Sequence, residues 1–457
     1  MTKVLSIGFD DTDSLRGSCT TYLATLIIHR IGDYVEFLDL PHLIRLNPNI
    51  PYKTRGNGAV ALRIRGEKAD LLYCKEVVLK QIEKSAEMDM KNTNPGVVFI
   101  EGKIPSSVKK HTQKALWQVL TIKETEQLAQ NPQIEIHKFK TGRGIIGAFG
   151  ALGHSLQSDH TYEHLSYRKR ENFGTDRRID EKSVYKADKA TPLTFSNIDY
   201  EYDSIMITPR GADPVFAGIR GETITTVREA WSYIKPLEPI PMQMVFKTNQ
   251  HTNQHFQHQL LIKNLQPHLS AIIEGVVTKT PRYITGGHLI FSIKDASGEI
   301  DCAAYEPTKR FRGQINGLLK GDRVKIFGGI RSPGKNHPMT INIERLQVLT
   351  LRPKMKKENP FCDECGTRLK SAGKNKGYKC PNCSKVFRNA QPIYRKVPRS
   401  LKIKEYLPPV VAHRHLTKPV AREKSENYGK KLSKKVIQKT LQDLIAYGKA
   451  HKDFNEL

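Results

Sequence analysis

The sequence predicts a multidomain α+β protein that ends in a β-barrel and a small metal-binding ribbon. Apolar strands alternate with helical patterns over residues 1–235, which is typical of α/β or α+β domains. Residues 268–350 contain five strand patterns with one helix after the third, the order of an OB-fold. Two C-x-x-C pairs follow at residues 362–383. A chain of 457 residues has room for about three or four domains of ~100–200 residues each.

Positive charge is concentrated near the C-terminus. The net charge is +28, and residues 351–457 hold 27 Lys and Arg against 9 Asp and Glu. This excess favours a polyanionic partner, with nucleic acid as the default; a lysine-rich surface that only aids solubility is the alternative. We expect no transmembrane helix, no secretory signal and no membrane partner, because apolar runs are short and the N-terminus leads into a polar loop. Few, mostly paired cysteines indicate a reducing, cytoplasmic setting.

Three carboxylates follow the first predicted strand, Val4–Phe9. They are Asp10, Asp11 and Asp13. A helix predicted over Thr21–Ile31 begins a few residues later, with Thr20 or Thr21 as its N-cap. Carboxylates at a strand end suit Mg²⁺, and the free N–H groups of a helix N-terminus suit an anion, which is the arrangement that phosphoryl transfer needs. The alternative is an acidic surface turn that caps the helix.

A long polar loop, residues 47–58, separates the predicted strands Glu36–Leu40 and Ala59–Arg65. A helix over Ala69–Ala86 and a strand over Gly96–Ile100 follow it. The loop carries two cations and two glycines, and functional residues favour loops on a rigid scaffold. It is therefore a candidate for contact with a nucleotide, and a solvated connection is the alternative.

Residues 142–147 spell G-x-G-x-x-G, after a helix predicted over Gln113–Gln130 and a strand over Ile134–Phe139. This pattern is the dinucleotide fingerprint, but the chain beyond it does not return as a clear βαβ unit, so we reject a Rossmann domain. Close packing of a helix on a sheet, or backbone contact with a ligand, explains the glycines better.

Asp213 lies among arginines in a loop predicted over residues 209–221, between the strand Ser204–Thr208 and a helix over residues 222–234. It has two possible roles. The carboxylate can hold a cationic substrate group through charge-assisted hydrogen bonds, or it can pair structurally with Arg210 or Arg220.

The OB-fold prediction includes candidate stacking platforms for bases. These aromatic residues are Tyr283, Phe291, Tyr305 and Phe327, of which we expect at least half to be in the core. The barrel strands are predicted at Ile272–Lys279, His288–Lys294, Glu299–Tyr305, Arg323–Ile330 and Met339–Val348.

The two C-x-x-C pairs are the strongest local signal. They consist of Cys362, Cys365, Cys380 and Cys383. Four thiolates at this spacing close a tetrahedral, structural Zn²⁺ site of the zinc-ribbon type, and a redox pair is the rival interpretation. Lysines between the pairs suit RNA phosphates. The basic tail beyond the ribbon contains an amphipathic helix predicted over Ser433–Lys449, which either docks on the body or lies along a nucleic acid.

Taken together, these motifs resemble the archaeal synthetases that make 2-agmatinylcytidine in the minor isoleucine tRNA. The resemblance covers nearly the whole chain and rests mainly on GFDDTDS and GSCTTY in residues 8–22, with support from the segments 53–58, 142–148 and 213–221. It implies a kinase-like ATP-binding domain at residues 1–110 and a ferredoxin-like agmatine-binding domain at 111–262, two parts that can interleave. An OB-fold RNA-binding domain at 268–350, a zinc ribbon at 358–395 and a basic tail with a helix at 396–457 complete the expected order.

The resemblance also implies an activity. The family joins agmatine to C2 of the wobble cytidine in a tRNA with a CAU anticodon, so that AUA is read in place of AUG. ATP is consumed to AMP, and the γ-phosphate passes to a threonine near the N-terminus and activates the cytidine. The implied cofactors are ATP, Mg²⁺ and structural Zn²⁺, the implied partners are this tRNA and agmatine, and no obligate protein partner is inferred.

The site residues implied by the resemblance fall into three groups. Thr20 corresponds to the phosphorylated threonine, beside Asp10, Asp11 and Asp13 as catalytic carboxylates around Mg²⁺ and ATP. The residues expected at the ATP phosphates are Gly17, Ser18, Lys53, Arg55 and Asn57, and the residue expected at agmatine is Asp213.

Two other functions stay open from the sequence alone. The first is a non-catalytic protein that binds single-stranded nucleic acid, since an OB-fold and a zinc ribbon also occur together in such proteins. The second is an ATP-dependent enzyme that uses another amine or another RNA site. ATP turnover separates the first from the main interpretation, and amine competition separates the second.

Overall fold

One mixed sheet of ten strands organises the first half of the chain. The computed structural model describes residues 2–335 and 337–451. Neighbouring strands of the sheet are β6 (Ile134–Lys138), β5 (Gly96–Glu101), β1 (Lys3–Asp10), β4 (Gly58–Gly66), β3 (His42–Arg45), β12 (Met242–Thr248), β7 (Thr161–Tyr167), β11 (Val215–Gly221) and β8 (Thr194–Phe195), with β2 (Glu36–Phe37) beside β4. The sheet therefore joins residues of the predicted first and second domains through the parallel pairing of β3 with β12.

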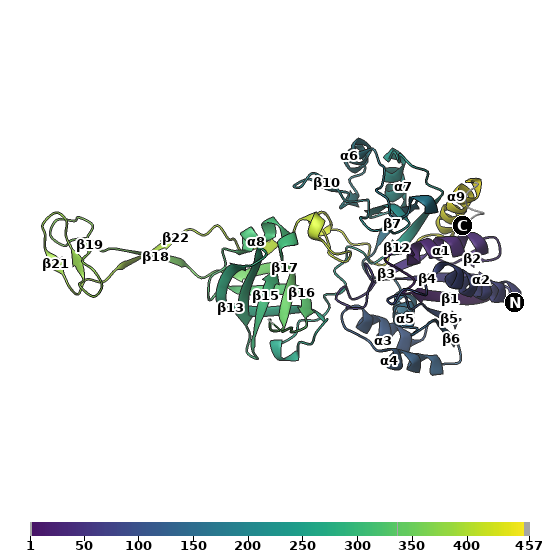
Figure 1. Cartoon of the computed structure of the whole chain (residues 1–457), viewed down its shortest axis with the longest axis horizontal. Coiled ribbons are helices and arrows are strands. Elements are labelled where there is room, and N and C mark those ends of the chain that lie inside the picture. Colours follow the sequence, from purple (N-terminus) through teal and green to yellow (C-terminus); the bar gives the residue numbers. More distant parts are fainter. Residues whose placement is uncertain (1, 336, 452–457) are drawn as a thin grey trace.

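Helices cover both faces of this sheet (Figure 1). They are α1 (Thr20–Ile31), α2 (Lys68–Ser85), α3 (Ser106–Ala115), α4 (Ile122–Glu126), α5 (Ile145–Gly153), α6 (Glu181–Ala190) and α7 (Ile224–Tyr233), and the short pair β9 (Ile198–Asp199) and β10 (Ser204–Ile205) lies outside it. Strand β4 shows why two layers form. Val60, Leu62 and Ile64 pack in the same core as α1, whereas Ala59 and Ala61 pack with α3 and α5, because successive side chains point to opposite faces.

Three sequence predictions in this region were wrong. The helix expected over Gln113–Gln130 is two helices, α3 and α4, because Thr121 and Glu124 form a reciprocal capping box that starts a new one. The loop expected over residues 209–221 ends in strand β11, whose glycines pack closely against their neighbours. The strand expected over Glu36–Leu40 ends at Phe37, and β3 follows it.

The OB-fold forms as predicted. Its strands and helix are β13 (Ser270–Ile284), β14 (His288–Lys294), β15 (Glu299–Ala304), α8 (Arg310–Ile315), β16 (Arg323–Arg331) and β17 (Thr340–Thr350). The barrel closes through the parallel pairing of β15 with β17. Of the candidate stacking residues, Phe291 is in the core, whereas Tyr283 is exposed and Tyr305 lies under the guanidinium of Arg331, 5.8 Å from its ring centre.

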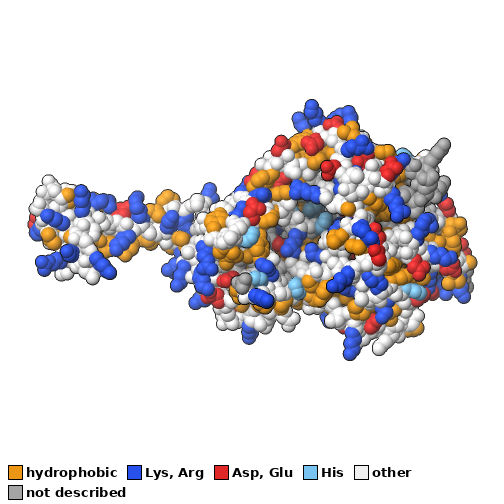
Figure 2. Space-filling model, in the orientation of Figure 1, with side chains coloured by type: hydrophobic (Ala, Val, Ile, Leu, Met, Phe, Trp, Pro, Cys, Tyr) orange, Lys and Arg blue, Asp and Glu red, His pale blue; other side chains and the backbone are white. Residues whose placement is uncertain are grey.

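The zinc ribbon lies at the end of a two-stranded stalk (Figure 1). The stalk pairs β18 (Lys354–Glu358) with β22 (Ile393–Val397), and the ribbon pairs β19 (Lys370–Ser371), β20 (Tyr378–Lys379) and β21 (Val386–Phe387). Figure 2 shows Lys and Arg side chains gathered along ribbon and stalk, with few acidic ones.

After the ribbon, the chain returns to the N-terminal unit. Strand β23 (Glu405–Tyr406) joins the barrel beside β17, and helix α9 (Lys434–Ala450) packs against α1 and β12. We call residues 405–427 between them the return segment. Ser433 caps α9 as predicted, because its side chain accepts a hydrogen bond from the Val436 N–H. The helix docks on the body, where its buried residues join the main core.

Within the described residues, no helix is both long enough and apolar enough to span a membrane.

Candidate active site

The acidic motif lies where β1 ends. Asp10 is the last residue of the strand, and Asp11 has a left-handed backbone with φ of 60°. Burial raises the pKa of Asp10 to about 7 and that of Asp11 to about 8, and repulsion between the two carboxylates adds to the second shift. Arg143 pairs with Asp11 at 2.8 Å. This crowded pair favours a cation more strongly than an ordinary surface turn would.

Helix α1 begins in a way that the sequence did not predict. Its N-cap is Cys19, which makes no side-chain capping bond, so the prediction of Thr20 or Thr21 was wrong. Asp13 takes over the capping role, because its Oδ1 accepts hydrogen bonds from both the Thr20 N–H (2.6 Å) and the Thr20 hydroxyl (2.9 Å). The hydroxyl of Thr20 is thus held beside a carboxylate, as a phosphoryl acceptor would require.

The glycines of residues 142–147 serve close packing, one of the two predicted alternatives. A Cβ on Gly147 would lie 1.8 Å from an Asp10 carboxylate oxygen, and one on Gly144 would lie 2.4 Å from the Asp10 carbonyl oxygen. Only glycine lets α5 come this near to the acidic strand end.

Two cavities meet at the acidic motif. The first, which we call the acidic cavity, has a volume of about 440 Å³ and combines the three carboxylates with an apolar wall and the polar loop. Its lining includes Asp10, Asp11, Asp13, Leu46, Ile50, Tyr52, Lys53, Arg55, Asn57, Val119, Ile122, Arg143 and Ile146. An apolar wall beside carboxylates and cations fits a nucleotide with its metal.

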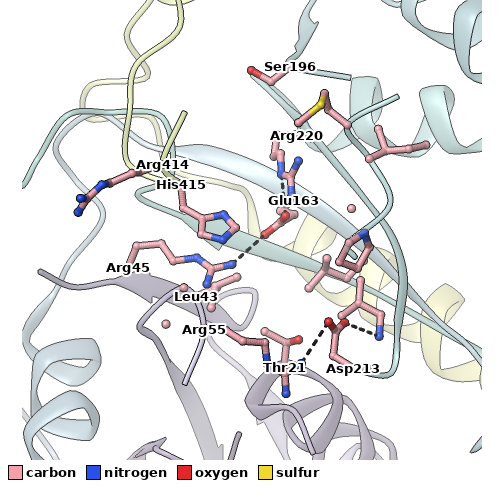
Figure 3. A pocket seen from close by; sticks show the side chains of 18 of the residues that line it. Thr21, Leu43, Arg45, Arg55, Glu163, Ser196, Asp213, Arg220, Arg414 and His415 are labelled. Atoms are coloured by element: carbon pink, nitrogen blue, oxygen red, sulfur yellow. Dashed lines mark hydrogen bonds and ion pairs between the residues drawn. The ribbon is translucent and has the colours of Figure 1, made fainter. Parts of the chain in front are cut away.

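The second cavity, which we call the central cavity, measures about 420 Å³. It lies among α1, β7, β11 and the return segment, and Figure 3 shows several of its side chains. Its lining includes Asp13, Thr20, Thr21, Arg45, Arg55, Glu163, Ser196, Arg210, Asp213, Arg220, His251, Arg414 and His415. Asp13 and Arg55 line both cavities, so they stand at the boundary between them.

The predicted phosphate contacts are only partly gathered. Lys53, Arg55 and Asn57 line the acidic cavity, but the Asn57 amide donates to the Asn47 carbonyl oxygen at 2.8 Å and so holds the loop in shape. Gly17 and Ser18 line neither cavity; their N–H groups donate to Ser14 Oγ at 3.1 and 3.2 Å.

Asp213 lies buried in the central cavity and does not pair with Arg210 or Arg220, so that structural alternative was wrong. Its carboxylate contacts Arg55 Nη1 at 3.2 Å and Arg177 Nη2 at 3.5 Å. Both partners come from segments distant in sequence, which is why spacing alone pointed to the nearer arginines.

Sequence reasoning missed a buried charge cluster on the far side of the central cavity. Glu163 Oε1 accepts from Arg220 Nε at 2.8 Å, and its Oε2 lies 4.0 Å from Arg45 Nη2 (Figure 3). His415 Nδ1 is 3.1 Å from Gln250 Oε1, and the charge of Arg45 together with burial lowers the pKa of His415 well below its usual range. The alternation of charged and apolar residues in 161–168 was the available signal.

The four ribbon cysteines are arranged as a metal site. All four Sγ atoms lie within 4.8 Å of one another, the spacing that a tetrahedral Zn²⁺ site needs. Among residues 2–335 and 337–451, theirs is the one group of three or more such ligands gathered this tightly.

Comparison with known proteins decides the family. Sequence models of the TiaS TCKD domain, the TiaS FLD domain and the TiaS C-terminal zinc ribbon match residues 6–71, 142–255 and 359–401, and an OB-fold nucleic acid binding domain matches 271–349. The 2-agmatinylcytidine synthetase TiaS of Thermococcus sibiricus, named for the isoleucine-2 tRNA, is 43% identical over 93% of this chain and 97% of its own length. The chain belongs to the TiaS family. The TiaS of Pyrococcus horikoshii is 42% identical over 93% of the chain and 98% of its own length.

Solved TiaS structures share the whole architecture. A crystal structure of apo TiaS matches with a TM-score of 0.80 at 37% identity, over 94% of this chain and 100% of that one. A complex of TiaS with the isoleucine-2 tRNA and ATP matches with a TM-score of 0.82 at 37% identity, over 94% and 99%. The predicted fold class, including its OB-fold and zinc ribbon, is thereby confirmed.

Proposed function

We propose that this protein is an ATP-dependent ligase that joins agmatine to C2 of the wobble cytidine in a CAU-anticodon isoleucine tRNA. The observation that carries the proposal is the meeting of the two cavities at Thr20, Asp13 and Arg55, within a chain that belongs to the TiaS family. A complex of TiaS with the isoleucine-2 tRNA, AMPCPP and agmatine, 36% identical over 94% of this chain, supports the same set of substrates. The site of action would be the cytoplasm, where tRNA is modified and decoded.

ATP would occupy the acidic cavity. Asp10, Asp11 and Asp13 would hold Mg²⁺, which would neutralise charge on the phosphates. Lys53 and Arg55 would contact the phosphates, with Asn57, Gly17 and Ser18 shaping the loops beside them. Thr20 would accept the phosphoryl group, because its hydroxyl is held against Asp13 where the cavities meet.

The central cavity would receive agmatine and the extruded cytosine. Agmatine is dicationic at neutral pH, so it needs carboxylate partners, and Asp213 is the proposed one for its guanidinium. Phosphorylation of O2 would turn it into a leaving group. The neutral amine would then attack C2, the C2–O2 bond would break with phosphate leaving, and the nitrogen would lose a proton.

RNA would be held by the OB-fold and the zinc ribbon. Figure 2 shows the basic side chains along ribbon and stalk that fit phosphate contacts. We propose the domain limits 1–110, 111–262, 268–350, 358–395 and 396–457 for the parts that perform these tasks, with the first two interleaved through the shared sheet.

The test combines purified protein, ATP, Mg²⁺, agmatine and a transcript with a CAU anticodon, followed by mass spectrometry of the nucleosides. Cytidine that gains the mass of agmatine less water, only in the complete mixture, is the expected result. ATP breakdown without this product would point to another amine or RNA site, and no breakdown would favour a non-catalytic binding protein.

A further inference from the structure

Arg55 occupies an unusual place between the two cavities. Its guanidinium contacts Asp213 at 3.2 Å on the central side and Asp13 at 3.5 Å at the boundary. It also donates to the Ser14 carbonyl oxygen at 2.8 Å and to the Ser18 carbonyl oxygen. One cation therefore faces both the proposed phosphate site and the proposed amine site.

The charges of the central cavity make this placement consequential. Its lining holds five arginines, Arg45, Arg55, Arg210, Arg220 and Arg414, against the three carboxylates Asp13, Glu163 and Asp213. Without phosphate, a dicationic amine would enter a cavity with an excess of positive charge. The carboxylate that it needs, Asp213, is already covered by Arg55.

A phosphate in the acidic cavity changes that balance. Arginine binds phosphate through a planar fork, and Arg55 lines the acidic cavity as well as the central one. Phosphate would either draw Arg55 away from Asp213 or neutralise its charge where it stands. Both effects leave Asp213 more attractive to a cation, and Arg177 on its other side lines neither cavity.

We propose that Arg55 is a positioning residue that couples the nucleotide site to the amine site, so that agmatine binds tightly only when the nucleotide phosphates are present. The proposal rests on the function proposed above and adds an order to it. The amine is captured at Asp213 once the phosphate that activates the cytidine is in place. By thermodynamic reciprocity, agmatine must tighten nucleotide binding by the same factor.

The experiment is titration calorimetry of agmatine into the full chain, with and without a saturating non-hydrolysable ATP analogue and Mg²⁺. We expect the analogue to tighten agmatine binding by about tenfold or more, within the range usual for coupled sites. Arg55→Ala should bind agmatine more tightly than the parent chain without nucleotide, and the tenfold ratio should fall to about one. Arg55→Lys keeps the charge but loses the fork, so it should retain a reduced ratio.

Two controls separate coupling from general damage. Arg177→Lys alters the other partner of Asp213 and should keep the parent ratio, and so should Arg65→Ala on the surface. If Arg55→Ala does not fold, the reciprocal titration of the analogue into the parent chain, with and without agmatine, and the Arg55→Lys variant decide instead. Equal agmatine affinities in a chain that still forms agmatinylated cytidine would overturn the coupling alone, as would a parent-like ratio in Arg55→Ala. Failure to form that product would overturn the proposed function as well.

Discussion

Arg422 anchors the return segment, and its removal should loosen one wall of the central cavity. The side chain is only 1% exposed and lies between Asp159, at 2.8 Å, and Glu222, while Nη1 also donates to the His251 carbonyl oxygen at 2.7 Å. In Arg422→Met, both carboxylates would stay buried, with only Lys418 at 3.4 Å to compensate Asp159. Leaving a buried charge without its partner costs about 3–5 kcal/mol, a large part of the ~5–15 kcal/mol that stabilises a typical domain.

We expect Arg422→Met to lower the free energy of unfolding by about 3–5 kcal/mol in urea titrations. Because the segment carries Arg414 and His415 into the cavity, the variant should also become sensitive to proteases near these residues and lose product formation. A double-mutant cycle with Asp159→Asn should show a coupling of about 0.5–3 kcal/mol, since the second change removes part of the uncompensated charge. A change in stability below about 1 kcal/mol, with no new cleavage, would show that the anchor reasoning is wrong.

Three further predictions follow from the site, the ribbon and a buried histidine. Thr20→Ala should abolish agmatinylated cytidine in the mass-spectrometric assay while tRNA affinity stays within about twofold, because the phosphoryl acceptor is lost but the RNA surface is intact; normal product would exclude Thr20. Cys380→Ser should lose zinc by metal analysis and weaken tRNA binding, and an unchanged zinc content would refute the ligand assignment. Burial lowers the pKa of His164 to about 3, so above pH ~6.5 it is neutral in both states and has no effect on stability. Below that pH the unfolded chain takes up the proton first, and stability should fall by about 2 kcal/mol between pH ~6.5 and ~5; a His164→Gln variant with an equally steep loss in urea titrations would contradict this.

Much of the fold is written in local patterns. The strand–helix alternation, the OB-fold order, the cysteine spacing and the cap of α9 each depend on residues close in sequence, and the structure contains all of them. Strand β11 was missed because Gly218 and Gly221 resemble loop residues until the neighbours that exclude a Cβ are known.

The candidate site was harder to predict because its contacts join distant segments. Arg414 donates to Asn49 Oδ1 at 2.6 Å across 365 positions, and no local pattern carries that information. Glu163 and Arg220 were each visible as charges in apolar surroundings, but only the antiparallel register of β7 and β11 makes them a pair. Asp213 was found, yet its partners Arg55 and Arg177 were not, for the same reason.

The path of the return segment also has a consequence for biosynthesis. A ribosome makes the acidic motif first, whereas residues 410–415, which complete the central cavity, appear only after the barrel and the ribbon. The helix that follows them docks on α1, so the last part of the nascent chain closes on the first. An interrupted translation product would therefore carry the phosphate-handling residues without the finished cavity. Premature termination would in this way yield a chain unable to modify tRNA rather than a partly active one.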